Sequence, residues 1–264
     1  MTAATKVQMR MMGDNDVVLA DHTVNDWTGS KNQVKKAGER LRQPVGDSDA
    51  EIASYLEAIN IAERWRRAHS YVLTKGAMSL RSRCRTPGVA NWEVSQRQKR
   101  LITIMDKLGR IPGIRLDRMQ DIAGCRAIMD TVADVRKVQR QYHKTSRPEQ
   151  IRNEKDYILT PKTSGYRGVH MIVAYRAKNG AIGPEDLLVE VQLRTRIQHE
   201  WATTVEKIAG KVAFDLKSSV GPPEVLKFLS LVAEAMAHEE SGNVPPPVLL
   251  EDVRRARTAA GRFL

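Results

Sequence analysis

Hydrophobic and polar residues alternate strictly over Leu187–Arg194, which is the clearest pattern in the chain. A period of two is the geometry of a β-strand, so one face is predicted to be apolar and to pack into a core. The other face carries a carboxylate, an amide and a guanidinium in one row. Such a row is either the solvated face of an antiparallel strand, which is the common case, or a functional site. The apolar positions are Val189, Val191 and Leu193, and the polar positions are Glu190, Gln192 and Arg194.

The spacing of apolar residues elsewhere predicts helices that alternate with short strands. An arginine-rich segment, Leu80–Arg85, separates the first two predicted helices, and Asn179-Gly180 is a hairpin-type turn signal before the alternating strand. The predicted helices cover residues 48–69, 92–108, 132–142, 195–212, 224–239 and 249–263, and the predicted strands cover 121–129, 154–159, 169–175 and 187–194.

Composition and charge narrow the class of protein. The chain has 264 residues, of which 41% are hydrophobic and 28% charged, as in globular rather than disordered proteins. A net charge of +12 favours polyanionic partners such as nucleotides or RNA, whereas an aromatic content of 5% argues against a binder that stacks many single-stranded bases. The sequence contains neither an apolar run of membrane length nor a secretion signal, so we expect a cytoplasmic protein.

The pattern predicts one central domain with two additions. Residues 1–48 are polar and loosely basic, and we expect them to form a partly ordered basic arm. A single domain is predicted over 49–240, followed by a linker and helix over 241–264. Cys84 and Cys125 are too few to form a metal cluster alone and need not be bridged. Cys125 lies in an apolar run and is predicted to be a small buried residue.

Two further segments carry chemistry. Asp121–Met129 has a carboxylate at its start and Arg126 within its apolar run, and an arginine in a buried strand needs a partner or a ligand. The loop Thr160–Gly168 contains two glycines, which permit a close approach of a ligand to the backbone. The loop and the residues after it supply two fixed charges, a ring that can stack and a titratable imidazole, a combination that suits a nucleotide. These residues are Lys162, Arg167, Tyr166 and His170.

Four segments in order resemble the RelA/SpoT-type alarmone synthetase domain: Arg97–Leu108, Asp121–Met129, Asp156–His170 and Glu190–Trp201. The resemblance covers roughly residues 90–215, and four ordered motifs are far harder to obtain by chance than one. It implies an α/β (α+β) fold, with a mixed β-sheet of about five strands flanked by helices, similar to nucleotidyltransferases. It also implies an enzyme that transfers the β,γ-pyrophosphate of ATP to a ribose 3′-hydroxyl. The length matches a synthetase-only member, without a metal hydrolase pair.

The resemblance also assigns roles, which agree with the chemistry of the residue types. Asp121 and Glu190 would hold Mg²⁺, with Glu190 as an alternative general base, because a hard cation on phosphates prefers carboxylate oxygens. Arginines would enclose the adenine and lysines the ATP phosphates. Tyr166 would stack on the acceptor base. The implied ATP-binding residues are Arg97, Lys99, Lys107 and Arg126, and the implied acceptor-binding residues are Lys162, Tyr166, His170, Gln192 and Arg194.

The acceptor is left between two nucleotide classes. The segments Met119–Arg126, His199–Ala202 and Leu216–Ser219 are most similar to toxic small alarmone synthetases of toxin–antitoxin pairs, some of which modify the 3′-terminal adenosine of tRNA. The charge of +12 modestly favours tRNA, with a separate antitoxin protein as the expected partner. The alternative is (p)ppGpp synthesis from ATP and GDP or GTP, and a catalytically silent RNA- or partner-binding relative stays open. Gly168-Val169 replace the family's usual Ser-Leu, and Thr103 its usual serine.

Overall fold

The structure is a computed structural model, and it describes Trp27 and residues 29–144, 149–175, 187–210, 214, 216 and 219–263. The chain forms two compact units. The first comprises the residues up to 76 together with 96–124 and 174–190, and the second comprises 77–95, 125–173 and 191–264. The predicted turn at Asn179-Gly180 lies outside the described residues, as does Val212 at the end of a predicted helix.

The strands form one mixed sheet in the order β1-β2-β5-β4-β3. Lys99 N donates to Ile122 O at the end of β1, and Tyr157 N donates to Gly168 O, so β1 is antiparallel to β2 and β3 to β4. Gly124 lies beside Glu190 and Arg126 beside Gln192, so the residue numbers increase in the same direction along β2 and β5, and this pair is parallel. The predicted fold class is therefore confirmed. The strands are β1 Trp92–Gln98, β2 Ala123–Met129, β3 Gln150–Asp156, β4 Val169–Tyr175 and β5 Leu187–Thr195.

Both units also contain helices, and several of these begin directly after a residue that favours a helix start. Ser30 and Thr195 each form a capping box with a glutamine three residues later, which satisfies backbone N–H groups at the helix start. Proline occupies the first helical position twice, after Pro222 and Pro246. The helices are α2 Lys31–Arg40, α3 Asp49–Arg85, α4 Leu101–Arg110, the 3₁₀ helix η1 Leu116–Arg118, α5 Val132–Tyr142, α6 Arg196–Ala209, α7 Pro223–Glu240 and α8 Pro247–Ala260.

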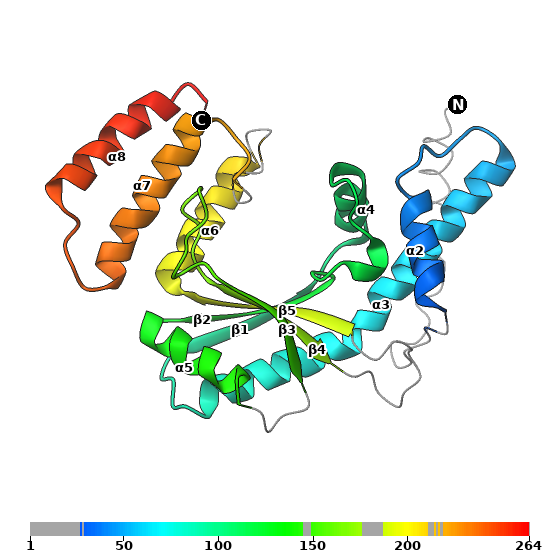
Figure 1. The fold of residues 1–264 in the computed structure, drawn as a ribbon, viewed down its shortest axis with the longest axis horizontal. Coiled ribbons are helices and arrows are strands. Elements are labelled where there is room, and N and C mark those ends of the chain that lie inside the picture. Colours follow the sequence, from blue (N-terminus) through cyan, green and yellow to red (C-terminus); the bar gives the residue numbers. More distant parts are fainter. Residues whose placement is uncertain are drawn as a thin grey trace. The chain divides into compact units, whose positions relative to one another are not determined.

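In the first unit, α2 packs against η1 and against the start of α3. A Cβ built on Gly38 would lie 2.7 Å from Leu116 Cβ, so only glycine permits this approach. Arg40 donates to Glu51 O across the α2–α3 contact, which Figure 1 shows in blue and cyan. Trp27 meets Trp65 edge to face at a centroid distance of 5.7 Å. Residues 31–40 of the predicted arm therefore form a capped and packed helix, whereas the domain limits at 48 and 240 remain predictions.

In the second unit, α6 and α7 enclose an apolar cluster beside the loop 160–168. Trp201 and Val205 of α6 pack there with Leu229 and Ala233 of α7. Trp201 Nε1 also donates to Leu229 O over 3.3 Å, so the buried indole N–H is satisfied. The last helix, α8, packs along α7 (Figure 1).

Three predicted elements differ from the structure. Residues 92–98 form an edge strand rather than the first half of a helix, because pairing with β2 outweighs the helical spacing of Val94 and Leu101. The first helix runs through Leu80–Arg85 instead of ending near His69. The third strand begins at Gln150 and ends at Asp156, since the chain turns at 157–159. Among the described residues, no helix is long and apolar enough to cross a membrane.

Candidate active site

Asp121 lies just before β2 in the first unit, held between two lysines. Its Oδ2 accepts from Lys99 Nζ over 3.0 Å and from Lys107 Nζ over 2.8 Å. The local fold places both lysines there. Lys99 directly follows β1, and its backbone N–H donates to Ile122 O. Lys107 lies in the last turn of α4. The two predicted phosphate-binding lysines are thus brought to the predicted metal-binding carboxylate.

Two opposing effects act on this carboxylate. Burial raises the pKa of Asp121, while hydrogen bonds and charge from Lys107 and Lys99 lower it, and the net pKa lies below the usual value of an aspartate. Asp121 is therefore ionised at neutral pH. A permanently charged carboxylate is what a divalent cation requires as a ligand.

Glu190 enters the first unit from β5, the strand next to β2. Its carbonyl oxygen lies 3.8 Å from the position of a Cβ on Gly124, which is three residues after Asp121. Asp121, just before β2, and Glu190, on β5, therefore lie on neighbouring segments of one unit. Neither is enclosed in the apolar interior, because Glu190 is half-buried and the Asp121 side chain is 22% exposed.

The donor set around Asp121 fits a divalent cation. Among the residues that the structure describes, Asp121 Oδ1 is buried and has no hydrogen-bond partner. A buried ionised oxygen needs a polar or charged partner, and Mg²⁺ bound to phosphates is one that would supply positive charge there. No group of three or more His, Cys, Asp and Glu residues could hold a metal within the described chain. Asp121 and Glu190 would then bind Mg²⁺ together with phosphate oxygens and water, as is usual for that ion.

The two arginines expected to enclose adenine lie in different units. Arg97 is exposed on β1 of the first unit. Arg126 is half-buried on β2 in the second unit, where its guanidinium lies 3.4 Å from Gln192 Oε1 and 3.3 Å from His199 Nδ1. The predicted partner of this strand arginine is thus found on β5 and α6. The shared adenine site stays a prediction.

The loop 160–168 presents Tyr166 in the second unit. Backbone bonds close the loop, since Gly165 N donates to Lys162 O over 2.7 Å and Lys162 N to Tyr166 O over 3.2 Å. Tyr166 is fully buried, and its ring lies 6.1 Å from that of Trp201. Its hydroxyl forms a hydrogen bond with His170 Nε2.

Cations lie close to the Tyr166 ring. Arg194 Cζ is 5.1 Å from the ring centroid and Lys162 Nζ is 5.2 Å away, within the range of cation–π attraction. Arg194 Nη2 also donates to Gln192 Oε1 over 2.8 Å. All five predicted acceptor-binding residues belong to the second unit, and contacts link all of them, because Lys162, His170 and Arg194 contact Tyr166 and Gln192 contacts Arg194. A base that stacks on Tyr166 must displace part of this covering.

Two of the three polar side chains on this face of β5 are buried. Gln192 is 9% exposed and Arg194 is 1% exposed, while the apolar residues of the opposite face are fully buried as predicted. The solvated-face interpretation of the alternating pattern is thus wrong for these two residues, and Glu190 is half-buried. Cys125 is buried, as predicted.

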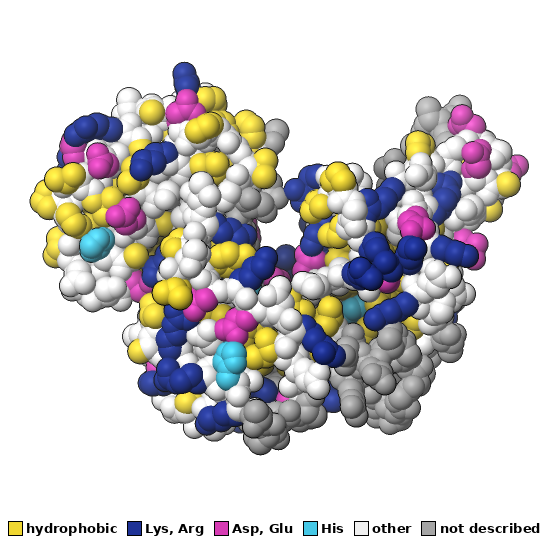
Figure 2. All heavy atoms as spheres, viewed as in Figure 1, with side chains coloured by type: hydrophobic (Ala, Val, Ile, Leu, Met, Phe, Trp, Pro, Cys, Tyr) yellow, Lys and Arg dark blue, Asp and Glu magenta, His cyan; other side chains and the backbone are white. Residues whose placement is uncertain are grey.

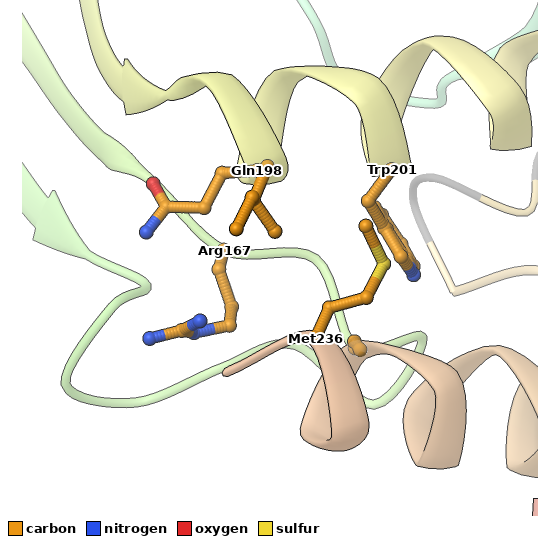
Figure 3. Close-up of a pocket in the computed structure, with 7 residues that line it drawn as sticks. Arg167, Gln198, Trp201 and Met236 are labelled. Carbon is orange, nitrogen blue, oxygen red and sulfur yellow. The ribbon is translucent and has the colours of Figure 1, made fainter. Parts of the chain in front are cut away.

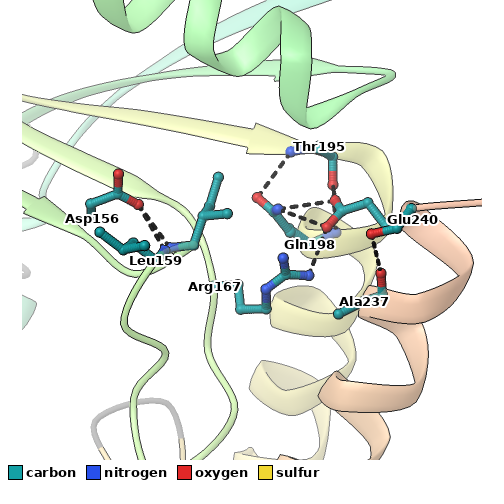
Figure 4. A network of polar contacts seen from close by, with 9 residues as sticks. Asp156, Leu159, Arg167, Thr195, Gln198, Ala237 and Glu240 are labelled. Atoms are coloured by element: carbon teal, nitrogen blue, oxygen red, sulfur yellow. Dashed lines mark hydrogen bonds and ion pairs between the residues drawn. The ribbon is translucent and has the colours of Figure 1, made fainter.

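Sequence reasoning gave no role to Arg167 beyond its charge and none to the side chains of Thr195 and Gln198, and it missed Glu240 entirely. The side chains of these four residues meet in one polar network, in which Arg167, Thr195 and Gln198 all donate to Glu240 (Figure 4). A small pocket adjoins it. Figure 3 shows Trp201 and Met236 on one side of this pocket and Arg167 and Gln198 on the other. No sequence signal marks Glu240, because its partners are distant in the chain.

Comparisons with known proteins agree with the sequence motifs. Residues 96–212 match the region found in RelA / SpoT proteins. GTP pyrophosphokinase YjbM of Bacillus subtilis is 29% identical over 172 residues, which are 64% of this chain and 67% of the relative. Guanosine-3′,5′-bis(diphosphate) 3′-pyrophosphohydrolase of Aquifex aeolicus is 31% identical over 88% of this chain, which spans only 28% of that protein's length.

A solved structure shows the same architecture. It is small alarmone synthetase 1 from Bacillus subtilis, bound to its product pppGpp, with a TM-score of 0.56 and 27% identity. The match covers 68% of this chain and 94% of that one. Residues 96–212 are therefore similar to the region found in RelA / SpoT proteins, and the chain is similar in sequence and fold to small alarmone synthetase 1 and to YjbM of Bacillus subtilis.

Proposed function

We propose that the chain is an ATP-dependent pyrophosphotransferase that makes (p)ppGpp, transferring the β,γ-pyrophosphate of ATP to the 3′-hydroxyl of GDP or GTP. The names of the similar proteins support this activity and this acceptor. ATP and guanosine nucleotides are the expected substrates, and the cytoplasm is the expected location. The observation that carries the proposal is Asp121, an ionised carboxylate gripped by two lysines with its second oxygen left for a cation.

The reaction balances with the groups present. The acceptor 3′-oxygen forms a bond to the β-phosphorus of ATP, the bond from that phosphorus to the α,β-bridging oxygen breaks, and AMP leaves with the electron pair. Glu190 accepts the proton of the 3′-hydroxyl or shares the metal with Asp121. Mg²⁺, when bound, neutralises phosphate charge. Phosphoryl transfer depends mostly on positioning and charge, which suits two carboxylates among many cations.

The remaining roles divide between the units. Lys99 and Lys107, which hold Asp121 in this structure, would bind ATP phosphates if Asp121 held Mg²⁺. The resemblance assigns adenine stacking to Arg97 in the first unit and to Arg126 in the second. On the acceptor side, Tyr166 stacks on the base. The residues around it that orient the acceptor are Lys162, His170, Gln192 and Arg194.

The 3′-terminal adenosine of tRNA is a second candidate acceptor, with toxicity held in check by an antitoxin. It is favoured by basic surface around the first unit, where Figure 2 shows Lys and Arg side chains gathered over α2 and α4. Exposed cations of this unit include Lys36, Arg100, Arg110 and Arg118. Such charges attract RNA phosphates but do not select a 3′-end. The names of the similar proteins therefore weigh more, and the guanosine nucleotide is preferred.

One labelling experiment separates these possibilities. The purified chain is incubated with Mg²⁺ and ATP labelled on the γ-phosphate, together with GDP, GTP or deacylated tRNA. We expect label on the guanosine nucleotide and release of AMP. Label on tRNA alone would replace the acceptor, and transfer to none of the three would support the silent binder instead.

A further inference from the structure

Glu240, the last residue of α7, has a buried carboxylate where three other segments meet (Figure 4). Its side chain is 1% exposed, and Arg167 Nη1 donates to Oε2 over 2.6 Å. Gln198 Nε2 donates to Oε1 over 2.9 Å and to Oε2 over 3.2 Å. Thr195 Oγ1 donates a further bond to Oε1. Both oxygens are thus occupied by protein donors, so this carboxylate holds side chains rather than a ligand.

The partners of Glu240 are the chain neighbours of two predicted acceptor-binding residues. Arg167 directly follows Tyr166, and Thr195 directly follows Arg194. Consecutive Cα atoms are only about 3.8 Å apart, so a shift of either partner moves the residue before it. Tyr166 and Arg194 also contact each other, at 5.1 Å from guanidinium carbon to ring centroid. One carboxylate therefore links the two segments that form this contact.

The same helix supports the loop on the other side of Tyr166. Gly165 has a φ of +84°, and a Cβ built there would lie 2.6 Å from Ala233 Cβ and 2.8 Å from Ser230 Cα. The loop backbone therefore rests directly on α7 at this glycine. Ala233 and Glu240 are seven residues apart, or about 10 Å along a helix. Helix α7 thus fixes the residues on both sides of Tyr166.

A structural purpose alone explains this arrangement poorly. A carboxylate at a helix C-terminus is disfavoured by the helix dipole, and a buried charge requires compensation. A neutral residue would end α7 without either cost. The charge is instead suited to holding the guanidinium of Arg167, which lies on the acceptor loop.

We propose that Glu240 is a positioning residue for the acceptor. It fixes Arg167 and Thr195, and through them it sets the geometry of Tyr166 and Arg194 for binding the guanosine base. The proposal rests on the proposed function, and it assigns a role to a residue beyond the matched region 96–212.

The test is Glu240→Gln, which keeps the size of the side chain and removes its charge. The matched control is Glu239→Gln, since Glu239 is the exposed neighbour on the same helix. KM for GDP, KM for ATP and kcat are measured well below the unfolding temperature. We expect KM for GDP to rise about 10-fold in Glu240→Gln, because small displacements of binding groups are costly, with KM for ATP within about 2-fold. The control should match the unmodified chain.

A second variant keeps the test decisive if Glu240→Gln folds poorly. Arg167→Gln removes the loop's bond to the carboxylate and should also raise KM for GDP selectively. The double variant should be no worse than the stronger single variant, because both remove the same contact. A general loss of stability would instead affect both substrates, and the effects of the two changes would add.

The outcomes separate the two proposals. If the unmodified chain transfers pyrophosphate, a selective and non-additive loss for GDP supports the positioning role, while equal changes for both substrates or no change overturn it. If the unmodified chain transfers nothing, the proposed function fails, and calorimetric titration with GDP and a non-hydrolysable ATP analogue decides the positioning role. Selective loss of GDP affinity would support it, and absent or unchanged GDP binding would overturn it.

Discussion

Asp121 and Tyr166 are enclosed in different ways, although each is the centre of its own unit's polar cluster. Asp121 is held by two lysines that lie within the stretch 99–121, and its second oxygen is buried without a hydrogen-bond partner among the described residues. Tyr166 is covered completely, by residues of its own loop, of β5 and of α6. The cluster around Asp121 is therefore suited to bind a cation, whereas the residues that cover Tyr166 must move before a base can stack on its ring. Charge thus dominates the acidic half of the site, which comprises Asp121, Glu190, Lys99 and Lys107. Packing dominates the aromatic half, which comprises Tyr166 and the residues that cover it.

The largest expected effect tests the acidic half. Glu190→Gln should lower kcat for pyrophosphate transfer by about 10³-fold, because it removes either a metal ligand or the general base. The unfolding temperature should change little, since the amide matches the carboxylate in size. Transfer to GDP from labelled ATP measures the rate. Glu200→Gln, on the exposed face of α6, is the control and should be fully active. Full activity of Glu190→Gln would remove this residue from the mechanism.

The second prediction concerns Asp121, whose Oδ1 is the proposed ligand of the cation. Asp121→Asn should lower kcat by about 10²-fold and raise the Mg²⁺ concentration needed for half-maximal rate, because the cation loses a charged ligand. A magnesium titration of the rate measures both effects. Asp106→Asn is the matched control, since Asp106 is 64% exposed and pairs with Arg110 in the same helix. A variant with an unchanged magnesium requirement would show that Asp121 serves its two lysines alone.

The acidic half could be predicted from the sequence better than the aromatic half. Glu190 was identified by strict alternation along one strand, and Asp121 by its place at the start of an apolar run. Lys99 and Lys107, which the resemblance assigns to the ATP phosphates, contact Asp121 in the structure, although the element before Lys99 is a strand and not a helix. Only the pairing of β1 with β2 settles that point, and pairing is a long-range interaction. Charged groups close in sequence can thus be grouped before their secondary structure is known.

The aromatic half depends on contacts that no local pattern reveals. Tyr166 was identified from its motif, but its complete burial follows from α6 and β5. Glu240 follows another glutamate at the end of an amphipathic helix, and its sequence neighbourhood is that of a solvated helix end. Its partners Arg167, Thr195 and Gln198 lie 42 or more residues away. Such a network is specified by the tertiary fold, so a sequence pattern cannot predict it.

The third prediction tests whether Tyr166 is more than packing. Tyr166→Leu keeps an apolar side chain in the buried site but removes the stacking face, which is worth about 1–3 kcal/mol per base. KM for GDP should therefore rise about 5- to 100-fold, with KM for ATP nearly constant. Tyr166→Phe is the control, because it keeps the ring and loses only the hydrogen bond to His170. If both variants bound GDP equally well, Tyr166 would be a core residue, and the comparison of the two halves would need another stacking partner.

The smallest expected effect concerns the pKa of His199, which lies beside Arg126. Burial lowers the pKa of His199, and the cations of Arg126 and Arg194 lower it further, while Glu206 and Glu93 partly oppose them. The imidazole is thus neutral at neutral pH. Because the unfolded chain takes up this proton near pH 6.5 and the folded chain only at lower pH, His199 should reduce stability as the pH falls below 6.5. Proton NMR of the imidazoles measures the pKa, with His199→Gln for assignment.

His69 provides an internal reference for this titration. It is 2% exposed, and burial alone lowers its pKa to about 4 against the opposing bond to Trp65 O. Arg126→Gln should therefore raise the pKa of His199 towards 6.5 and leave that of His69 unchanged, because only His199 lies beside this guanidinium. A His199 pKa at or above 6.5 in the unmodified chain would mean that the cations of the second unit are screened by solvent. The aromatic half would then be governed by packing alone, with no electrostatic selection for its acceptor.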